Sequence, residues 1–522
     1  MKKVFLLLLF LPLSLVAQER IMVIADPHVY APSLTDYGQA FEQMMAGQRK
    51  MIDQSAATWQ ALMDTALLYR PDLLLIPGDL TKDAEIESHQ LVVSSLNTLQ
   101  EAGIKTLLIP GNHDIGGNAY AYRGEEKTSI ESLSDESWES TYSLVYEQAT
   151  AKDPASHSYV AEPFQGVSVL GIDGSHNNAG IGSLSDETLA WLLAQADSAV
   201  EKGNMIIAMC HWQLMDHFDM QGQLEAACQL KNAAAMRDSL MHHGVRFVLT
   251  GHFHVNSITT WRDTTGLTTD SIVEISTGSP ITYPCPYRWL TVSEDRMDVQ
   301  VETGYITSLD TIPDMTSYSR EWMAEHTEIM IPTLALRAWQ KVDNNWSLVE
   351  AKLNSIGMGY LAPYLKAALP QTDSAKIDLV QRHIGNAAVN LYLFHSEANE
   401  NERPEIGKAL ADSLYNGMEN MLMEVYSSFD ELATIFASMA KVMAREPVQS
   451  LVEDVTLWSL SMYSDQTDDL HPMLRINSSQ QEAVENVRMG IEDDTIYDIL
   501  GRPVTDPSQH GVYIQNGQKI IR

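Results

Sequence analysis

Short apolar runs alternate with amphipathic stretches from Arg20 to about Gly304. Short apolar runs bounded by turn residues are typical of buried strands, whereas apolar residues at helical spacing are typical of helices that cover a sheet. Residues 43–69, 85–102 and 185–202 have this helical spacing. Because strands and helices alternate, we expect βαβ units and an α/β fold with a mainly parallel sheet.

The later part of this region contains strand-like runs with no helical stretch between them. They lie at residues 257–261, 271–276, 288–292 and 297–301. Turns join them, so we expect an antiparallel addition to the sheet system. The first domain then covers residues 18–310 and ends before a linker at 312–319.

Beyond the linker the chain is almost wholly helical in pattern. The candidate helices are residues 320–341, 374–398, 404–427 and 429–444, with breaks at Pro370 and Pro447. Apolar residues at helical spacing usually form the core between packed helices. We therefore predict a helical domain over residues 318–470, and its sequence contains no catalytic constellation.

Side chains able to bind metal follow five of the apolar runs, at the point where each run ends. They are Asp26 and His28, Asp79, Asn112, His211, and His252 with His254. Ligands of open α/β sheets bind at the carboxyl ends of the strands, where such side chains meet. The repetition indicates one site built from five loops.

These seven side chains combine carboxylate, imidazole and one amide. Such a set suits Mn, Fe or Zn better than Mg or Ca, which prefer oxygen ligands. Seven ligands are too many for one ion but fit two divalent or trivalent ions that share a carboxylate. Two ions about 4 Å apart can hydrolyse phosphoesters with a bridging hydroxide and polarise the phosphoryl oxygens.

The order of these motifs resembles that of the calcineurin-like metallophosphoesterases over residues 20–260. The matching motifs are Asp26-x-His28, Gly78-Asp79, Gly111-Asn112-His113-Asp114, His211 and Gly251-His252-x-His254. The resemblance implies a four-layer αββα sandwich. It also implies that Asp26, His28, Asp79 and His254 hold one metal, and that Asp79, Asn112, His211 and His252 hold the second.

The same resemblance implies roles for two further residues. His113 would lie near the leaving group, as a general acid or as a stabiliser of the transition state, and Asp114 would orient it. His217 lies six positions after His211, and we expect it to line the substrate cleft, although a structural role is the alternative. We expect structural roles for His89 and His157.

The motifs are most similar to those of an exported bacterial branch near the class III cyclic nucleotide phosphodiesterases. The segments that carry this likeness are Ala25-Asp26-Pro27-His28 with Ala31-Pro32-Ser33-Leu34, and Gly78-Asp79-Leu80-Thr81 with Ser88-His89. Purple acid phosphatases carry a Tyr three positions after the Gly-Asp aspartate, where this chain has Lys82. That subfamily is therefore disfavoured.

The 522 residues carry a formal net charge of −35. So acidic a surface repels polyanions, which argues against nucleic acid as a main partner. Met1-Lys2-Lys3 and the apolar run after it are typical of a signal peptide over residues 1–17, with cleavage near Ala17. We therefore expect an exported protein that is periplasmic, cell-surface or secreted. Three cysteines are too few for a disulfide framework.

The C-terminal residues 487–522 form a separate pattern. Asn516-Gly517 between apolar runs is a strong hairpin signal. This segment resembles the β-rich sorting domains of the bacterial type IX secretion pathway, which implies contact with the cell surface or the secretion machinery. The alternative is a small β-module that packs on its neighbour.

The sequence is compatible with three functions. The first is a phosphodiesterase or phosphatase that acts on small extracytoplasmic phosphoesters. The second is a sphingomyelinase-like lipid phosphodiesterase, because acid sphingomyelinases share the metal motifs and also carry a helical C-terminal domain. The third is a non-catalytic surface protein that retains its metals. The oligomeric state stays open.

Overall fold

The computed structural model describes residues 18–175, 182–217, 221, 228–263, 270–344, 346–355, 357–398 and 403–426, and five short strands beyond them. The chain forms two compact units, of which the first ends at Leu474 and the second spans Arg475–Arg522. The predicted signal peptide and the predicted helix 429–444 lie outside the described residues.

The N-terminal strands form one half of the first sheet, with β3 at its edge. Its order is β15 (Met473–Arg475), β14 (Asp298–Tyr305), β13 (Pro286–Val292), β1 (Glu19–Val23), β2 (Leu73–Ile76) and β3 (Lys105–Leu108). Strands β1, β2 and β3 are parallel, with Ile21 opposite Leu73 and Leu74 opposite Thr106. Strand β13 pairs antiparallel with β1 and with β14. The predicted antiparallel addition is therefore confirmed on this sheet.

The second sheet has a parallel centre with antiparallel edges. Its order is β11 (Ser257–Arg262), β12 (Ser271–Ser276), β10 (Phe247–Thr250), β9 (Met205–Cys210), β8 (Val167–Ile172), β7 (Tyr159–Phe164) and β6 (Ala149–Lys152). The predicted antiparallel addition is confirmed only in part on this sheet. Strand β12 is antiparallel to β11, as expected, but it is parallel to the core strand β10, where Phe247 pairs with Val273.

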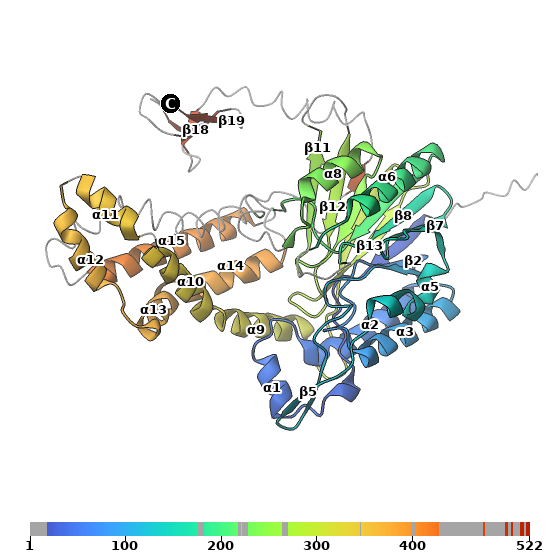
Figure 1. Ribbon diagram of the computed structural model, residues 1–522, viewed down its shortest axis with the longest axis horizontal. Coiled ribbons are helices and arrows are strands. Elements are labelled where there is room, and N and C mark those ends of the chain that lie inside the picture. The colour runs from blue at the N-terminus through green and yellow to red at the C-terminus, as the bar shows by residue number, and fades with distance from the viewer. Residues whose placement is uncertain are drawn as a thin grey trace, which may run out of the picture. The chain divides into compact units, whose positions relative to one another are not determined.

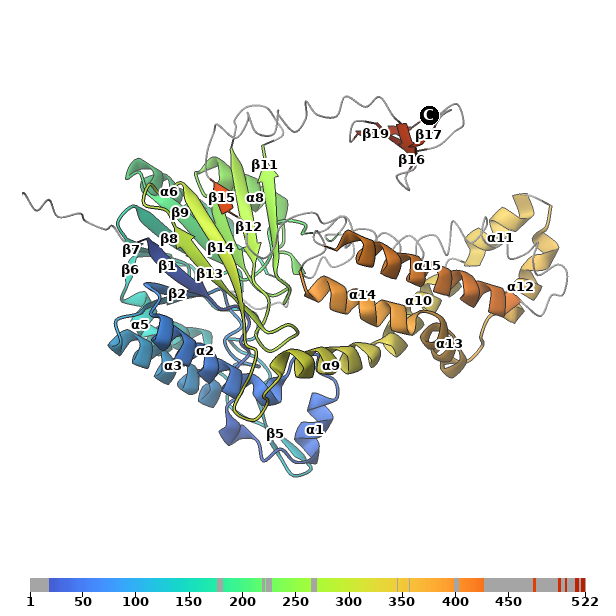
Figure 2. The same ribbon diagram turned by 180° about the vertical axis from the view of Figure 1, so that it is seen from behind.

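Helices cover the outer faces of both sheets (Figures 1 and 2). Helices α2 (Ser55–Tyr69) and α3 (Ile86–Glu101) lie on the first sheet, and α6 (Asp186–Glu201) and α8 (Ala233–His242) lie on the second. The Ser185 side chain accepts a hydrogen bond from the Thr188 amide and caps α6. The four-layer αββα sandwich is confirmed.

Short elements at the edge of the sandwich complete this region. They are η1 (Pro32–Leu34), α1 (Gln39–Met45), η2 (Ile52–Gln54), β4 (Tyr120–Arg123), β5 (Glu126–Ser129), η3 (Asp135–Ser137), α4 (Trp138–Thr141) and α5 (Ser143–Tyr146). The single helix expected over 43–69 is wrong. The α-helical path ends at Met45 and resumes at Ser55, and a loop followed by the short 3-10 helix η2 lies between them.

The helical region begins at Met315, inside the stretch expected to be a linker. Its helices are α9 (Met315–Glu328), α10 (Ile331–Asn344), α11 (Trp346–Ser355), η5 (Gly359–Leu361), α12 (Ala362–Ala368), α13 (Asp373–Val380), η6 (Gln381–Gly385), α14 (Asn386–Ser396) and α15 (Pro404–Tyr426). Buried side chains such as Trp339, Leu353 and Leu393 form its own core. The predicted packing of helices around an apolar core is thus present in the described part.

The second unit contains a four-stranded antiparallel sheet. Its order is β17 (Pro503–Val504), β16 (Ile496–Asp498), β18 (Val512–Gln515) and β19 (Gln518–Ile521). Gln515 pairs with Gln518 across the expected hairpin. The sheet agrees with the predicted β-rich module, while its role in sorting stays a prediction.

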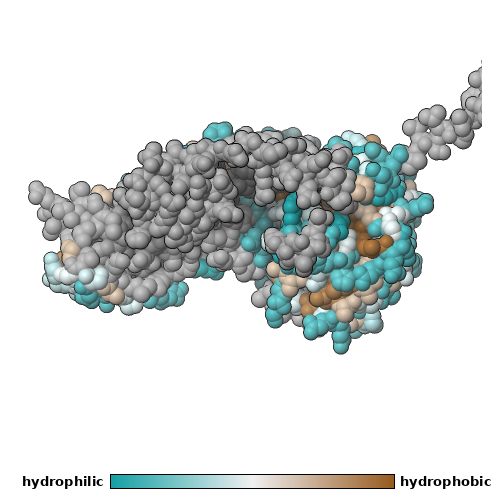
Figure 3. Space-filling model, turned by 90° about the horizontal axis from the view of Figure 1, so that it is seen from above, coloured by the Kyte–Doolittle hydropathy of each residue, from teal (hydrophilic) through white to brown (hydrophobic). Residues whose placement is uncertain are grey.

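On the face of the αββα sandwich seen in Figure 3, hydrophilic residues predominate and apolar residues form small, separate patches. Within the described residues, we find no helix with the length and apolar character needed to span a membrane.

Candidate metal centre

Two groups of metal-ligating side chains meet at the carboxyl ends of the strands and share one carboxylate. The first group is Asp26, His28, Asp79 and His254, and the second is Asp79, His211 and His252. Within each group the ligand atoms lie within 4.8 Å of one another. The loops after β1, β2, β9 and β10 supply these side chains, as the strand-end pattern predicts.

The carboxylate of Asp79 lies between the two groups. Its Oδ2 is 3.5 Å from His28 Nε2 and 3.4 Å from His211 Nε2. In the first group, His254 Nε2 lies 3.1 Å from His28 Nε2 and 3.4 Å from Asp26 Oδ1. Asp79 thus occupies the position that a bridging ligand needs.

Asn112 joins the second group. Its Oδ1 lies 3.1 Å from His211 Nε2, and His252 Nδ1 lies 3.2 Å from the same nitrogen. The Trp212 ring packs on the imidazole of His252 with 4.0 Å between centroids, which restricts its orientation. All seven predicted ligands are therefore brought together, and their binding of metal stays a prediction.

The donor set fits two transition-metal ions. Asp26, His28, Asp79 and His211 are at most 1% exposed, and buried carboxylates are costly unless cations compensate them. The Nδ1–H of His211 donates to the carbonyl of Pro77 at 2.9 Å, so its Nε2 faces the group as the ligand atom. Mixed imidazole and carboxylate donors are those that Mn, Fe and Zn accept.

The backbone at the ligands is strained. Five ligand residues have left-handed φ values: Asp26 at 52°, His28 at 40°, Asp79 at 52°, His252 at 62° and His254 at 62°. Residues other than glycine rarely adopt this region, and such strain concentrates at functional sites. The turns after the strands therefore hold these residues in an unfavourable left-handed backbone conformation, which directs their side chains to one place.

A glycine permits the close approach of two of these loops. A Cβ atom on Gly111 would lie 2.2 Å from Asp79 Oδ1 and 2.3 Å from the Asp79 amide nitrogen. No side chain fits there, so glycine is required for contact between the loops after β2 and β3.

The charges of the two groups depend on one another. Burial opposes ionisation of Asp79, but the neighbouring His211, His113 and His28 outweigh it and hold the pKa of this carboxyl well below its usual value. Burial lowers the pKa of His211, but Asp79 and Asp26 reverse the effect and raise it to about 9. Burial lowers the pKa of His28 well below its usual value. The carboxylates of Asp79 and Asp26 thus favour positive charge between the two ligand groups.

His113 lies beside the two groups, with its side chain 30% exposed. Its amide donates to Asp79 Oδ1 at 2.9 Å, and its ring makes an edge contact with the His28 ring at 4.9 Å. The Nδ1 atom of His113 lies 2.9 Å from Asp83 Oδ1. Asp83 in turn pairs with Lys82. Asp83 was not predicted from the sequence, where its only signal is its place four residues after Asp79.

Asp114 has a different role from the one expected. It is buried, and it accepts hydrogen bonds from the amides of Leu80 at 3.1 Å, Thr81 at 2.9 Å and Gly111 at 2.8 Å. Burial and the charge of Asp79 raise the pKa of its carboxyl to about 7. Asp114 thus fastens the loop after β2 to the loop after β3, and Asp83 contacts the ring of His113 instead.

The structure does not bring His217 to the metal groups. Its side chain is 0% exposed, so it cannot line a substrate cleft, and its Nε2 lies 3.0 Å from Glu274 Oε1. Glu274 also accepts from the Leu214 amide at 2.9 Å and the Thr250 hydroxyl at 2.9 Å. The pair holds the loop after β9 against β10 and β12.

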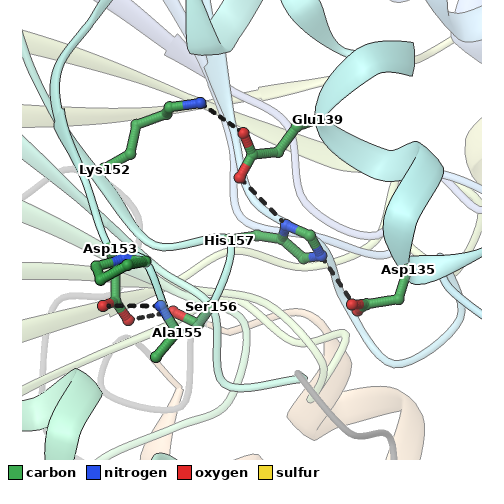
Figure 4. A pocket seen from close by; sticks show the side chains of 8 residues that line it. Asp135, Glu139, Lys152, Asp153, Ala155, Ser156 and His157 are labelled. Atoms are coloured by element: carbon green, nitrogen blue, oxygen red, sulfur yellow. Dashed lines mark hydrogen bonds and ion pairs between the residues drawn. The ribbon is translucent and has the colours of Figure 1, made fainter.

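A polar pocket of about 390 Å³ lies outside both groups (Figure 4). His157 Nε2 lies 3.1 Å from Asp135 Oδ1, and the Lys152 ammonium lies 2.7 Å from Glu139 Oε2. These acidic and basic side chains pair with one another, and none of the predicted ligands lines the pocket. The structural role expected of His157 stays a prediction.

Residues 19–256 match the family model described as calcineurin-like phosphoesterase, and this range contains every predicted ligand. No curated protein matches the chain. Similar solved structures include a dimetal phosphatase from Danio rerio, with 14% identity and a TM-score of 0.38 over 55% of this chain and 95% of that one.

Two further solved structures resemble this chain. One is a purple acid phosphatase from yellow lupin seeds, with 12% identity and a TM-score of 0.32 over 55% of this chain and 52% of that one. The other is a phosphopantetheinyl hydrolase from Mycobacterium tuberculosis, with 13% identity and a TM-score of 0.26 over 51% of this chain and 91% of that one. Likenesses this low carry no information about the substrate.

Proposed function

We propose that this metal-dependent phosphoesterase, in which residues 19–256 form a calcineurin-like phosphoesterase domain, hydrolyses small phosphomonoesters or phosphodiesters outside the cytoplasm. The observation that carries the proposal is the Asp79 carboxylate. Its Oδ2 lies between the imidazole nitrogens of His28 and His211, at 3.5 Å and 3.4 Å. A single buried carboxylate between two ligand groups suits a centre for two ions.

We assign one ion to the first ligand group and one to the second, with Asn112 as a further ligand of the second. We infer Mn, Fe or Zn from the mixture of imidazole and carboxylate donors. When bound, two such ions supply positive charge for the phosphoryl oxygens and a water activated for attack. The protein residues fix these positions through buried side chains and strained turns.

His113 is the general acid in this proposal. Its Nδ1 is engaged by Asp83, so its Nε2 is the atom that transfers a proton to the leaving oxygen of the ester. The Asp83–Lys82 pair keeps in place the carboxylate that contacts Nδ1 of His113. Asp83 is therefore a positioning residue, and His113 is the residue that contacts the reacting atoms.

We also propose that the protein is exported and that it belongs near the class III cyclic nucleotide phosphodiesterases. The signal-peptide pattern over residues 1–17 supports export, and the segments around Ala31 and Ser88 support the branch. The Ala31 amide donates to Ser88 Oγ at 3.1 Å, so these segments of the motif are in contact. The C-terminal sheet supports a sorting or anchoring role for residues 487–522.

A panel of chromogenic monoesters, diesters and cyclic nucleotides tests the proposal, with metal returned to stripped enzyme. We expect metal-dependent turnover of soluble esters. Faster turnover of micellar sphingomyelin than of every soluble ester would support the lipid alternative instead. Metal binding without turnover of any phosphoester would support the non-catalytic alternative.

A further inference from the structure

A lysine outside the predicted site lies near the first ligand group. Lys50 lies in the loop between α1 and η2 and is half-buried. Its ammonium lies close enough to Asp79, Asp83 and Asp26 to interact with their charges. The same ammonium is also near enough to His28 and His254 to act on their charges. Lys50 therefore places a positive charge beside residues that are proposed to bind metal.

The loop that carries Lys50 is fixed on both sides. The Met51 amide donates to the carbonyl of Ile281 at 2.8 Å, and Ser279 Oγ donates to the carbonyl of Asp26 at 2.7 Å. Residues 279–281 thus connect the Lys50 loop to the first metal-ligand turn.

Arg49 attaches the same loop to the helical region. Its guanidinium donates to the hydroxyl of Tyr392 on α14 and lies 5.1 Å from the centroid of that ring. The position of Lys50 relative to the ligand groups is therefore set by packing and hydrogen bonds on either side of it.

A structural ion pair does not account for this lysine. Among the residues that the structure describes, no carboxylate lies within ion-pair distance of Lys50, whereas the nearby Lys82 is paired with Asp83. Burial lowers the pKa of Lys50 and opposes its charged form, and an ammonium beside two metal ions is repelled by them. Both effects make an unpaired ammonium at this place unfavourable. An anion that arrives with the substrate would compensate its charge.

We propose that Lys50 binds a phosphoryl oxygen of the substrate beside the first ligand group. The inference rests on the proposed function and adds a substrate-binding residue to it. Two divalent ions with Asp26 and Asp79 leave a formal charge of about +2, and Lys50 raises it to about +3. Additional positive charge attracts a doubly charged monoester more strongly than a singly charged diester, so Lys50 favours monoesters.

The test replaces Lys50 by Met and by Gln in the metal-loaded full chain and measures kcat, KM and the Ki of inorganic phosphate. We expect KM for a monoester and the Ki of phosphate to rise roughly 10- to 100-fold, the effect of losing a charge-assisted hydrogen bond. KM for a diester should rise less, and Lys50→Arg should restore part of the phosphate affinity.

Metal content separates binding from a structural role. Because Lys50 repels the ions, both variants should retain metal at least as tightly as the wild-type protein. Lys202→Met is the matched control, since its ammonium lies at the exposed end of α6 and pairs with Glu162 at 2.6 Å. It should leave the Ki of phosphate unchanged.

Phosphate affinity within about twofold of wild type in both Lys50 variants would overturn the inference. Loss of metal in parallel with phosphate affinity would overturn it as well, because it would assign Lys50 to the architecture of the site. Wild-type enzyme inactive on every ester would instead refute the proposed function. Calorimetric binding of inorganic phosphate to the metal-loaded variants would then still decide the role of Lys50.

Discussion

At the scale of single residues, the proposed proton transfer depends on three side chains, Lys82, Asp83 and His113, each of which contacts the next. Lys82 pairs with Asp83, Asp83 contacts Nδ1 of His113, and the His113 ring borders His28. None of the three belongs to the seven predicted metal ligands. The residues that hold metal and the residues that handle the proton can therefore be tested separately.

We expect His113→Ala to retain both metal ions and the fold, but to lower kcat by about 10²–10⁴-fold on esters with poor leaving groups. The loss should shrink for nitrophenyl esters, because nitrophenolate leaves without much help from an acid. Asp83→Asn should show the same trend at smaller size, since the amide keeps a contact and removes the charge. The measurement is kcat across leaving groups of differing pKa, and an equal loss on all of them would contradict the acid role.

The second prediction at this scale concerns Gly111. An added Cβ would lie 2.2 Å from Asp79 Oδ1, so Gly111→Ala should displace the bridging carboxylate. We expect loss of bound metal and a fall in turnover of roughly 10²-fold, as for a displaced catalytic group. Gly47→Ala is the control, because the nearest atom to its added Cβ is 3.7 Å away. Elemental analysis that finds equal metal in both variants would refute the steric argument.

The ligands could be predicted from the sequence because each follows an apolar run, and strand ends converge at a sheet edge. The contacts of Asp83 and Asp114 could not, because they depend on the path of the turns after β2 and β3. The prediction for His217 was wrong for a related reason. Its distance from His211 in sequence says nothing of the buried partner, Glu274, which comes from β12.

At the scale of elements, helix α3 is attached to the site by a buried histidine. His89 Nδ1 lies 2.6 Å from the Tyr142 hydroxyl, and its Nε2 lies 3.0 Å from the Asp114 carbonyl. Burial lowers the pKa of His89 from 6.5 to about 3, so the ring stays neutral in the folded protein. Between about pH 3 and pH 6.5, the His89 ring of the unfolded chain therefore binds a proton that the same ring in the folded protein does not bind.

The sign of the effect follows from this difference in proton binding. The stability contributed by neutral His89 is complete above pH 6.5 and is lost as the pH falls toward about 3. We expect metal-stripped protein to lose up to about 1.4 kcal/mol of unfolding free energy per pH unit through this residue. His89→Gln should have a shallower acid slope in urea titrations, and parallel slopes for the two proteins would contradict the assignment.

Elements with a regular pattern were predicted well, and breaks were not. Strands β1, β2, β9 and β10 and helices α3 and α6 lie where the apolar spacing placed them. The loop before Ser55 was missed, because its residues continue a helical spacing while Arg49 and Met51 form contacts to distant segments. The parallel pairing of β12 was missed for the same reason, since it is decided by a neighbour far along the chain.

At the scale of the whole molecule, catalysis and placement are assigned to different parts of the chain. The first unit contains the candidate centre, and the described residues of the second are Arg475, at the end of β15, and the small C-terminal sheet. We expect removal of residues 487–522 to leave kcat unchanged and to alter where the protein resides, while the mature N-terminus begins near Gln18. Fractionation with N-terminal sequencing checks this, and a large loss of kcat would instead assign the C-terminal segment a packing role.

The central claim is that Asp79 and the six other predicted ligands hold two metal ions that are required for phosphoester hydrolysis. The most direct test is a titration of metal-stripped enzyme with Mn, Fe or Zn, with elemental analysis and turnover measured at each step. The account predicts no turnover without metal and a plateau of activity at two ions per chain. Full activity in protein shown to be free of metal would contradict it.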